Sequence, residues 1–290
     1  MDNIRSVQPI LGALHSISLG SWQAALNQSG RVRRYAEQLM ALLPPLLPHL
    51  PTGRPAKRFA SSSVAADGAE TQAVILAVGS ERGLCGRFNA AVVERAEARV
   101  ADRVETGAAV ELAGLGTRVC RLLQRRGHGL AWSGSLSITA LPSFGLALNL
   151  TRDWIARYEA HQLDVVDVLH NAYRGPGRYE PTVTRLIPPQ LPAGDAVDAS
   201  GAGGANLAII ETDPLSLYVR VIEQWAAVSL YGLLLDSAAA EHAARYALME
   251  AATQNTEQLI VELTLAIQMA RQQAITREMQ ELAAGAGMIG

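Results

Sequence analysis

The sequence has few of the features that mark several common protein classes. Its 290 residues include only two cysteines, Cys85 and Cys120, which excludes a disulfide scaffold and a four-cysteine zinc site. The 25 basic and 27 acidic side chains nearly balance, so no strong positive field favours nucleic acid as a partner. Residues 6–30 carry no charge, but polar side chains interrupt them before they reach the roughly 20 apolar residues of a membrane span. Since 49% of the residues are hydrophobic, we expect a soluble protein with a sizeable core.

Residues suited to metal or acid–base chemistry are also scarce. No two of the six histidines lie four residues apart, the spacing typical of a helical metal site. Asp164 and Asp167 flank two valines and suggest an acid–base pair, but alternation along a strand or salt bridges at a helix edge is the favoured explanation. Cys120 lies in an apolar helical pattern, which favours a core position. We therefore expect no metal, no cofactor and no catalytic residue.

Proline is missing from both ends of the chain, in residues 10–43 and again after Pro214. In both stretches apolar residues recur every three or four positions, which predicts long helices. Asp213 and Pro214 form a typical helix start, with the acid as the cap and the proline in the first turn. The predicted segments are an N-terminal shaft helix in residues 1–51, a linker rich in Ser, Ala and Gly in 52–72, and a C-terminal shaft helix in 212–290.

The C-terminal helix is too long for a compact globule. Apolar residues follow a seven-residue repeat from Tyr218 to Ala274, the pattern of a left-handed coiled coil. At about 1.5 Å per residue, residues 213–284 would extend roughly 108 Å, whereas residues 10–43 would extend about 51 Å. The long helix must therefore project, and it pairs with another chain or with residues 10–43. We expect an antiparallel coiled-coil shaft built from the two ends of the chain, with an exposed apolar stripe as a binding surface.

The middle of the chain, residues 73–211, alternates between strand and helix patterns. A short apolar run at 73–78 is typical of a strand that is buried on both faces. The alternation predicts a small, largely parallel sheet with helices on its faces, a Rossmann-like α/β domain inserted between the shaft helices. The further segments are helices in 89–104, 117–126 and 147–160, a strand in 109–113, the stretches 165–173 and 182–187, and a last strand in 207–211.

A glycine-rich turn, residues 79–86, joins the first strand to the first helix of this domain. Such turns cradle phosphate at helix N-termini, but neither the dinucleotide pattern nor the phosphate-loop pattern is present. Glu81 would also repel a phosphate unless its side chain turned away. Cys85 lies where a nucleophile could lie, yet no histidine or aspartate nearby in sequence supports that role, so a small buried thiol is favoured.

Two parts of the sequence resemble the gamma subunit of F-type ATP synthases. Residues 80–89 are similar to that family's Ser-Asp-Arg-Gly-Leu-Cys-Gly-Gly-Phe-Asn signature, and residues 237–245, 249–255 and 270–278 are similar to its C-terminal signatures in order and spacing. Residues 164–171 and 186–188 resemble two intervening landmarks. The signature residues that carry the resemblance in the turn are Arg82, Gly83, Leu84, Cys85, Gly86, Phe88 and Asn89.

The resemblance implies a non-catalytic rotor that forms the central stalk of a proton- or sodium-transporting ATP synthase. Rotation of its asymmetric faces would bias each surrounding subunit among its nucleotide-affinity states. The implied partners are the alpha and beta subunits around the shaft, the epsilon subunit and the membrane c-ring, with the chain peripheral to the cytoplasmic side of the bacterial plasma membrane. By family analogy, the contacts with the ring are made by Arg245, Gln272, Thr276 and Glu278.

The N-terminal stretch departs from the family. Where the family carries a lysine-rich segment, residues 10–19 contain no lysine. This departure favours a divergent second copy of the subunit, such as that of a sodium-translocating N-type ATPase. Two other functions stay open on the residues alone, a coiled-coil scaffold outside any ATPase and an enzyme that binds phosphate at residues 79–86.

Overall fold

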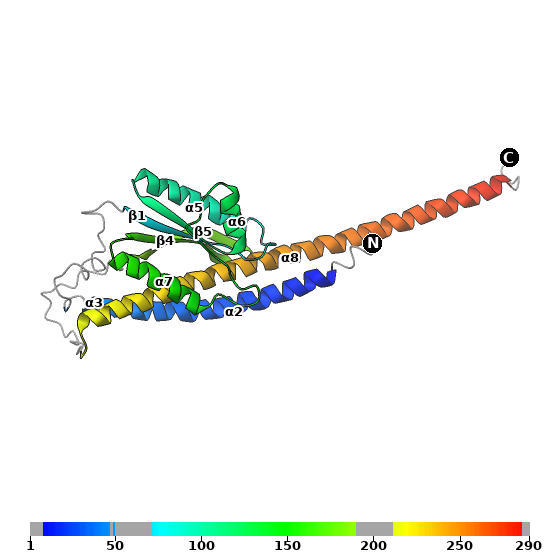
Figure 1. Ribbon diagram of the computed structural model, residues 1–290. Coiled ribbons are helices and arrows are strands. Elements are labelled where there is room, and N and C mark those ends of the chain that lie inside the picture. The colour runs from blue at the N-terminus through cyan, green and yellow to red at the C-terminus, as the bar shows by residue number, and fades with distance from the viewer. Residues whose placement is uncertain (1–7, 47–48, 50–70, 190–210, 286–290) are drawn as a thin grey trace.

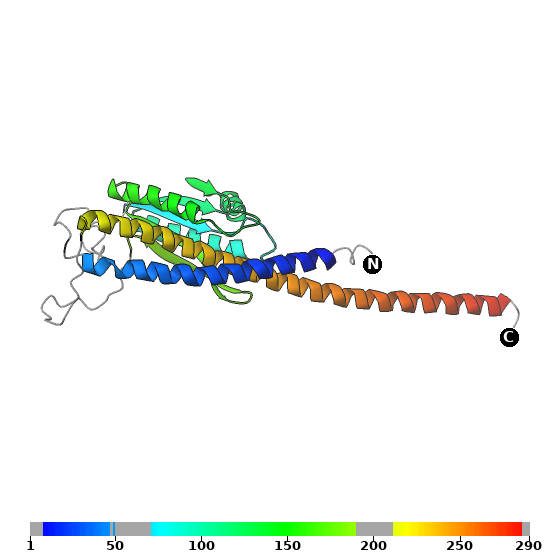
Figure 2. The ribbon, with the colours of Figure 1, turned by 90° about the horizontal axis from the view of Figure 1, so that it is seen from below.

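The protein is an elongated molecule with a compact body and a long helix that leaves it. The computed structural model describes residues 8–46, 49, 71–189 and 211–285. Helix α2 (Gln8–Ala41) and helix α8 (Pro214–Gly285) lie side by side and run in opposite directions, and a short helix α3 (Leu43–Leu46) follows α2 (Figures 1 and 2). The antiparallel shaft with an inserted α/β domain is confirmed.

A five-stranded sheet forms the centre of the body, in the order β3-β2-β1-β4-β5. The first four strands along this order are parallel to one another, and β5 is antiparallel to β4. Only two residues separate β4 from β5, too few for a parallel crossover, so the pair closes as a hairpin. The strands are β1 (Gln72–Val78), β2 (Ala109–Leu115), β3 (Trp132–Gly134), β4 (Val165–Gly175) and β5 (Arg178–Ile187).

Helices cover both faces of the sheet. On one face α5 (Phe88–Glu105) and α6 (Thr117–Arg125) pack on Ile75 and Ala77 of β1. On the other face, α7 (Phe144–Glu159) and the first half of α8 pack on the residues of β1 that alternate with Ile75 and Ala77. Because alternate residues of a strand point to opposite faces, a strand with both faces covered is apolar throughout, as predicted for residues 73–78. The strand predicted in 207–211 lies almost wholly outside the described residues.

Contacts between α2 and α8 fix the register of the shaft. Gln28 Nε2 donates to the Tyr231 hydroxyl at 2.6 Å, and His15 Nε2 lies 3.0 Å from Glu250 Oε2. His15 faces Glu250, and α2 begins about two turns before His15. Because the two helices are antiparallel, their pairing ends about two turns beyond Glu250, near residue 257. The remainder of α8, residues 258–285, has no helix beside it in the described part of the chain (Figure 2).

The unpaired end of α8 keeps the apolar character of the paired part. The apolar stripe with the seven-residue repeat is buried at Tyr218 and at Met249, but Leu263 and Ile267 of the same stripe are about 40% exposed. None of the described helices is both long and apolar enough to cross a membrane. The exposed large apolar side chains of this end are Leu259, Val261, Leu263, Leu265, Ile267, Met269, Ile275, Met279 and Leu282.

The start of α8 follows the predicted cap. The backbone N–H and the hydroxyl of Ser216 donate to the Asp213 carboxylate at 2.9 and 2.7 Å. These hydrogen bonds lower the pKa of Asp213. An acidic cap bound to the first turn in this way sets where the helix begins.

Candidate functional site at the junction of the turn and the long helix

The glycine-rich turn is held in shape by its own polar groups. The Ser80 N–H donates to Asn89 Oδ1 at 2.9 Å, and Asn89 Nδ2 returns a bond to Ser80 Oγ at 2.8 Å. Ser80 Oγ in turn donates to the Arg82 carbonyl at 2.7 Å. A side chain at Gly79 would drive its Cβ into the Val119 side chain, so glycine is required where the turn crosses α6. The turn is thus a rigid piece of backbone.

The tip of the turn presents one apolar side chain to solvent. Leu84 has a φ of 62°, a conformation that costs energy for a residue with a side chain, and it is 57% exposed. Its neighbour Cys85 is buried, and Cys85 and Phe88 pack against Ala240 of α8. Cys85 of the turn and Phe88 of α5 therefore contact α8, while Leu84 points outward.

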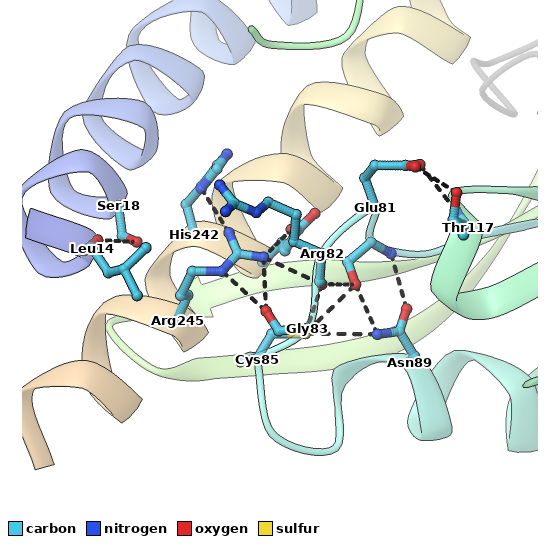
Figure 3. Close-up of polar contacts among 12 residues, drawn as sticks. Leu14, Ser18, Glu81, Arg82, Gly83, Cys85, Asn89, Thr117, His242 and Arg245 are labelled. Atoms are coloured by element: carbon cyan, nitrogen blue, oxygen red, sulfur yellow. Dashed lines mark hydrogen bonds and ion pairs between the residues drawn. The ribbon is translucent and has the colours of Figure 1, made fainter. Parts of the chain in front are cut away.

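Arg245 makes the polar half of this attachment. Its guanidinium donates to the Gly83 carbonyl from Nε and from Nη2, each at 3.3 Å (Figure 3). It also donates to the Glu241 carboxylate one helical turn away. Arg245 and Glu241 are both at least 90% buried. Burial raises the pKa of Glu241, and the charge of Arg245 opposes that rise. The two side chains form a buried ion pair that joins the shaft to the turn.

His242 completes the cluster as a neutral ring. Its Nδ1 lies 3.2 Å from Arg245 Nη1, which can only donate, so this nitrogen accepts and carries no proton. Burial, with the charge of Arg245, lowers the pKa of His242 to about 4.

This lowered pKa predicts a loss of stability in acid. Between pH 6.5 and about 4 the unfolded chain binds a proton at His242 that the native state does not, so the free energy of unfolding falls as the pH falls. The fall in the free energy of unfolding that His242 accounts for is about 1–3 kcal/mol. Urea unfolding at pH 7.5 and at pH 4.5 measures it: His242→Gln should show a smaller fall than the wild type. The exposed control His49→Gln should fall as the wild type does, and equal falls in all three proteins would contradict the assignment.

Glu81 of the turn occupies the N-terminus of α6, not that of α5, the helix that follows the turn. Its carboxylate accepts from the Thr117 N–H at the start of α6, from the Thr117 hydroxyl, and from the Leu136 N–H. Although its partial burial acts in the other direction, these hydrogen bonds lower the pKa of Glu81 and keep it charged. The cavity beside the turn measures about 30 Å³, room for about one water molecule. The geometry therefore favours a structural turn over a nucleotide site.

The other candidate chemical groups are also used structurally. Burial raises the pKa of both Cys85 and Cys120, which disfavours the reactive thiolate. Asp164 accepts from the Thr71 backbone at the entrance to β1, and Asp167 is buried among arginines. The two carboxylates do not face a common substrate site.

The comparisons with known proteins agree with one another. The family described as ATP synthase matches residues 1–288. The ATP synthase gamma chain of Granulibacter bethesdensis is 30% identical over 290 residues, covering 99% of this chain and 96% of that protein. The gamma chain of Rubrobacter xylanophilus is also 30% identical, covering 99% and 94%. The chain belongs to the ATP synthase gamma family.

Solved structures support the fold of this gamma chain. The central stalk of the Tetrahymena thermophila mitochondrial ATP synthase superposes with a TM-score of 0.57 at 19% identity, covering 84% of this chain and 99% of that one. The rotor of the Euglena gracilis enzyme gives 0.54 at 12% identity, covering 94% and 95%. These structures show the fold. Membership of the gamma family makes this chain the central-stalk rotor, a non-catalytic subunit, and neither an unrelated scaffold nor a phosphate-binding enzyme.

The four residues expected to contact the ring fall in two places on gamma. Arg245 is buried at the junction, where its partners are intramolecular. Gln272, Thr276 and Glu278 lie on the unpaired end of α8 and are exposed. Their contacts with other subunits stay predictions. The anchoring role of Arg245 and the capping role of Glu81 are not apparent in the sequence, because each depends on a carbonyl or an N–H that lies far away along the chain.

Proposed function

We propose that the unpaired end of α8 turns inside the ring of alpha and beta subunits, with the turn at residues 79–86 facing the entrance of that ring. The observation that carries this proposal is that the apolar stripe continues to Ala274, and exposed apolar side chains continue to Leu282, with no partner helix among the described residues. An exposed stripe of this length needs an enclosing apolar partner. The Tetrahymena chain was solved as part of a central stalk with its c-ring, which supports a rotor axis of this kind.

The coupling would work through contacts that differ from one ring subunit to the next. A single helix presents different side chains in each direction, so every surrounding subunit meets a different face of α8. A subunit's nucleotide affinity shifts only as far as these contacts favour one of its states over another. Leu84, exposed at the tip of a rigid turn, offers a further contact at the base of the shaft.

The opposite end of the molecule would serve the other partners. We place the c-ring and the epsilon subunit around the body, which includes the starts of α8 and β1 (Figure 1). In this arrangement the protein is peripheral to the cytoplasmic side of the membrane. The sodium-translocating N-type complex, suggested by the lysine-free residues 10–19, stays a prediction that the sodium dependence of ATP hydrolysis in the purified complex would test.

The proposed ring contacts can be tested without disturbing the fold. The combined variant Gln272→Ala, Thr276→Ala and Glu278→Ala should leave the melting temperature unchanged, because all three side chains are exposed. ATP synthesis by the assembled complex should fall by about fivefold or more, the lower range of an allosteric coupling energy. Arg277 and Glu281 lie on the same exposed segment but pair with each other, so the comparison variant Arg277→Ala and Glu281→Ala should lower synthesis less than the triple variant does. Equal activity of both variants would remove these residues from the coupling.

A further inference from the structure

An open groove lies between α7 and the edge strand β3, on the face of the sheet that α7 covers. Its volume is about 580 Å³, and most of the side chains that line it are apolar. Because soluble proteins rarely leave a large apolar hollow open to water, such a groove marks a binding site. The apolar side chains of its lining are Val74, Ala113, Trp132, Leu146, Leu150 and Trp154.

Trp132 forms the outer wall of this groove. It pairs with Ala113 of β2, so both side chains point to the face on which α7 lies. A Cβ added at Gly134 would lie 2.4 Å from Trp132 Cη2, so the indole lies over that glycine. Trp132 is 36% exposed, whereas the second indole of the groove, that of Trp154, is buried. An exposed indole held in this way is typical of a side chain that anchors a partner protein.

The segment that builds β3 and the start of α7 carries no charged side chain. Residues 129–151 contain no Asp, Glu, Lys, Arg or His, although 18% of the whole chain is Asp, Glu, Lys or Arg. Charged side chains are depleted at the centres of protein interfaces, and aromatic side chains are enriched there. The shape of the groove and this lack of charge are separate observations, and both point to a protein partner.

The groove fits a helix better than an added strand. It follows one face of α7 from Leu146 to Arg157, a length of about 17 Å or three helical turns. Strand β3, with three residues, is too short an edge to pair with another strand over that length. A helix beside α7, at the usual distance of about 8–10 Å between axes, would continue the helical layer over β2 and β3.

The charged side chains of the groove lie toward one of its ends. Arg157 Nη2 lies 2.6 Å from Glu111 Oε1, so these two charges are paired. Asp153, one turn before Arg157, is exposed and has no hydrogen bond or ion pair with any described residue. Two carboxylates and one guanidinium leave this end with one negative charge. A basic side chain of the partner is complementary to that charge and sets the orientation of the bound helix.

We propose that this groove binds an amphipathic helix of another subunit, with apolar side chains between Trp132 and α7 and a lysine or arginine at Asp153. Helix α8 lies between α7 and α2, so the groove is on the side of the body away from α2 (Figure 2). The bound helix turns with the rotor and leaves the unpaired end of α8 free for the ring. This inference rests on the proposed placement of other subunits around the body.

Photo-cross-linking in the assembled complex tests the proposal. Asn149→benzoylphenylalanine places a cross-linker at the exposed rim of the groove, and Glu105→benzoylphenylalanine, on the exposed surface of α5, is the control. Irradiation of the complex, purified through a tag on this chain, should join the Asn149 variant to a segment of another subunit. That segment should have apolar residues every three or four positions and a lysine or arginine beside them. The Glu105 variant should not give this product.

The composition of the same eluate separates failure of this proposal from failure of the proposed rotor placement. A complex that contains alpha and beta subunits but gives no cross-link at Asn149 would overturn the bound helix and leave the rotor intact. A cross-link to an extended segment or to lipid would overturn it as well. An eluate without alpha and beta subunits would contradict the proposed function, and this inference with it.

Reversal of one charge tests the orientation of the helix. Asp153→Lys should lower the yield of the Asn149 cross-link by about fivefold or more, because repulsion replaces attraction. Glu105→Lys makes the same change in charge on α5 and should leave the yield unchanged. Both side chains are exposed, so neither substitution should change the melting temperature. Equal yields in the two variants would overturn the basic contact at Asp153 and the orientation that it sets.

Discussion

Arg245→Ala is expected to lower the free energy of unfolding of this gamma chain by about 3–5 kcal/mol, a large effect for a single substitution. The substitution removes the partner of Glu241 and leaves that carboxylate buried without a counter-charge. It also removes the donors to the Gly83 carbonyl that join α8 to the turn. Chemical denaturation followed by circular dichroism measures the loss.

A matched pair on the same helix serves as the control. Arg277 and Glu281 also lie four residues apart with an N–O distance of 3.1 Å, but their side chains are 81% and 67% exposed. Arg277→Ala should therefore change the free energy of unfolding by less than about 1 kcal/mol. The double variant Arg245→Ala and Glu241→Gln should regain part of the loss, because no buried charge is left unpaired. Similar losses in Arg245→Ala and Arg277→Ala would show that burial of the pair is unimportant.

Truncation of the chain after Glu257 is expected to separate folding from function. Residues 258–285 lie beyond the paired part of the shaft, so the thermal transition of the body should stay within a few degrees of the wild type (Figure 2). ATP synthesis by the assembled complex should fall by at least about tenfold, because the differential contacts with the ring are lost.

A full-length variant with a destabilised core is the control for the truncated protein, because it loses stability but keeps the unpaired end of α8. Leu235 is fully buried where α8 packs on the sheet, so Leu235→Ala should lower the free energy of unfolding by about 2–5 kcal/mol. Assembled complex containing Leu235→Ala that remains folded at the assay temperature should synthesise ATP near the wild-type rate, because its unpaired end of α8 is intact. A truncated subunit that retained full synthesis would contradict the role given to that end.

Much of the architecture can be predicted from the sequence because it depends on repetition. The proline-free stripe after Pro214 predicts α8, and the same argument predicts α2 as its shorter antiparallel partner. The apolar run that becomes β1 indicates a strand covered on both faces. These elements are long or strongly patterned, which is where periodicity is informative.

The remaining features depend on contacts between distant residues. Strand β3 has three residues, too few to show a period, and it is placed by pairing with β2. Arg245 and Gly83 are 162 positions apart, so nothing in the sequence near either residue reveals their bond. The resemblance to the family does mark both positions. It does not say whether such a residue contacts another subunit or anchors its own chain, because either role would place the same residue in the same motif.

The role of this chain as the rotor of a rotary ATP synthase is tested most directly by a pull-down of the tagged protein from its native membranes. Subunits in the eluate are identified by mass spectrometry, and ATP hydrolysis is assayed in the same material. Alpha, beta, epsilon and c subunits should be recovered together with ATPase activity. Recovery of the chain alone, or with unrelated proteins and no ATPase activity, would contradict the rotor role.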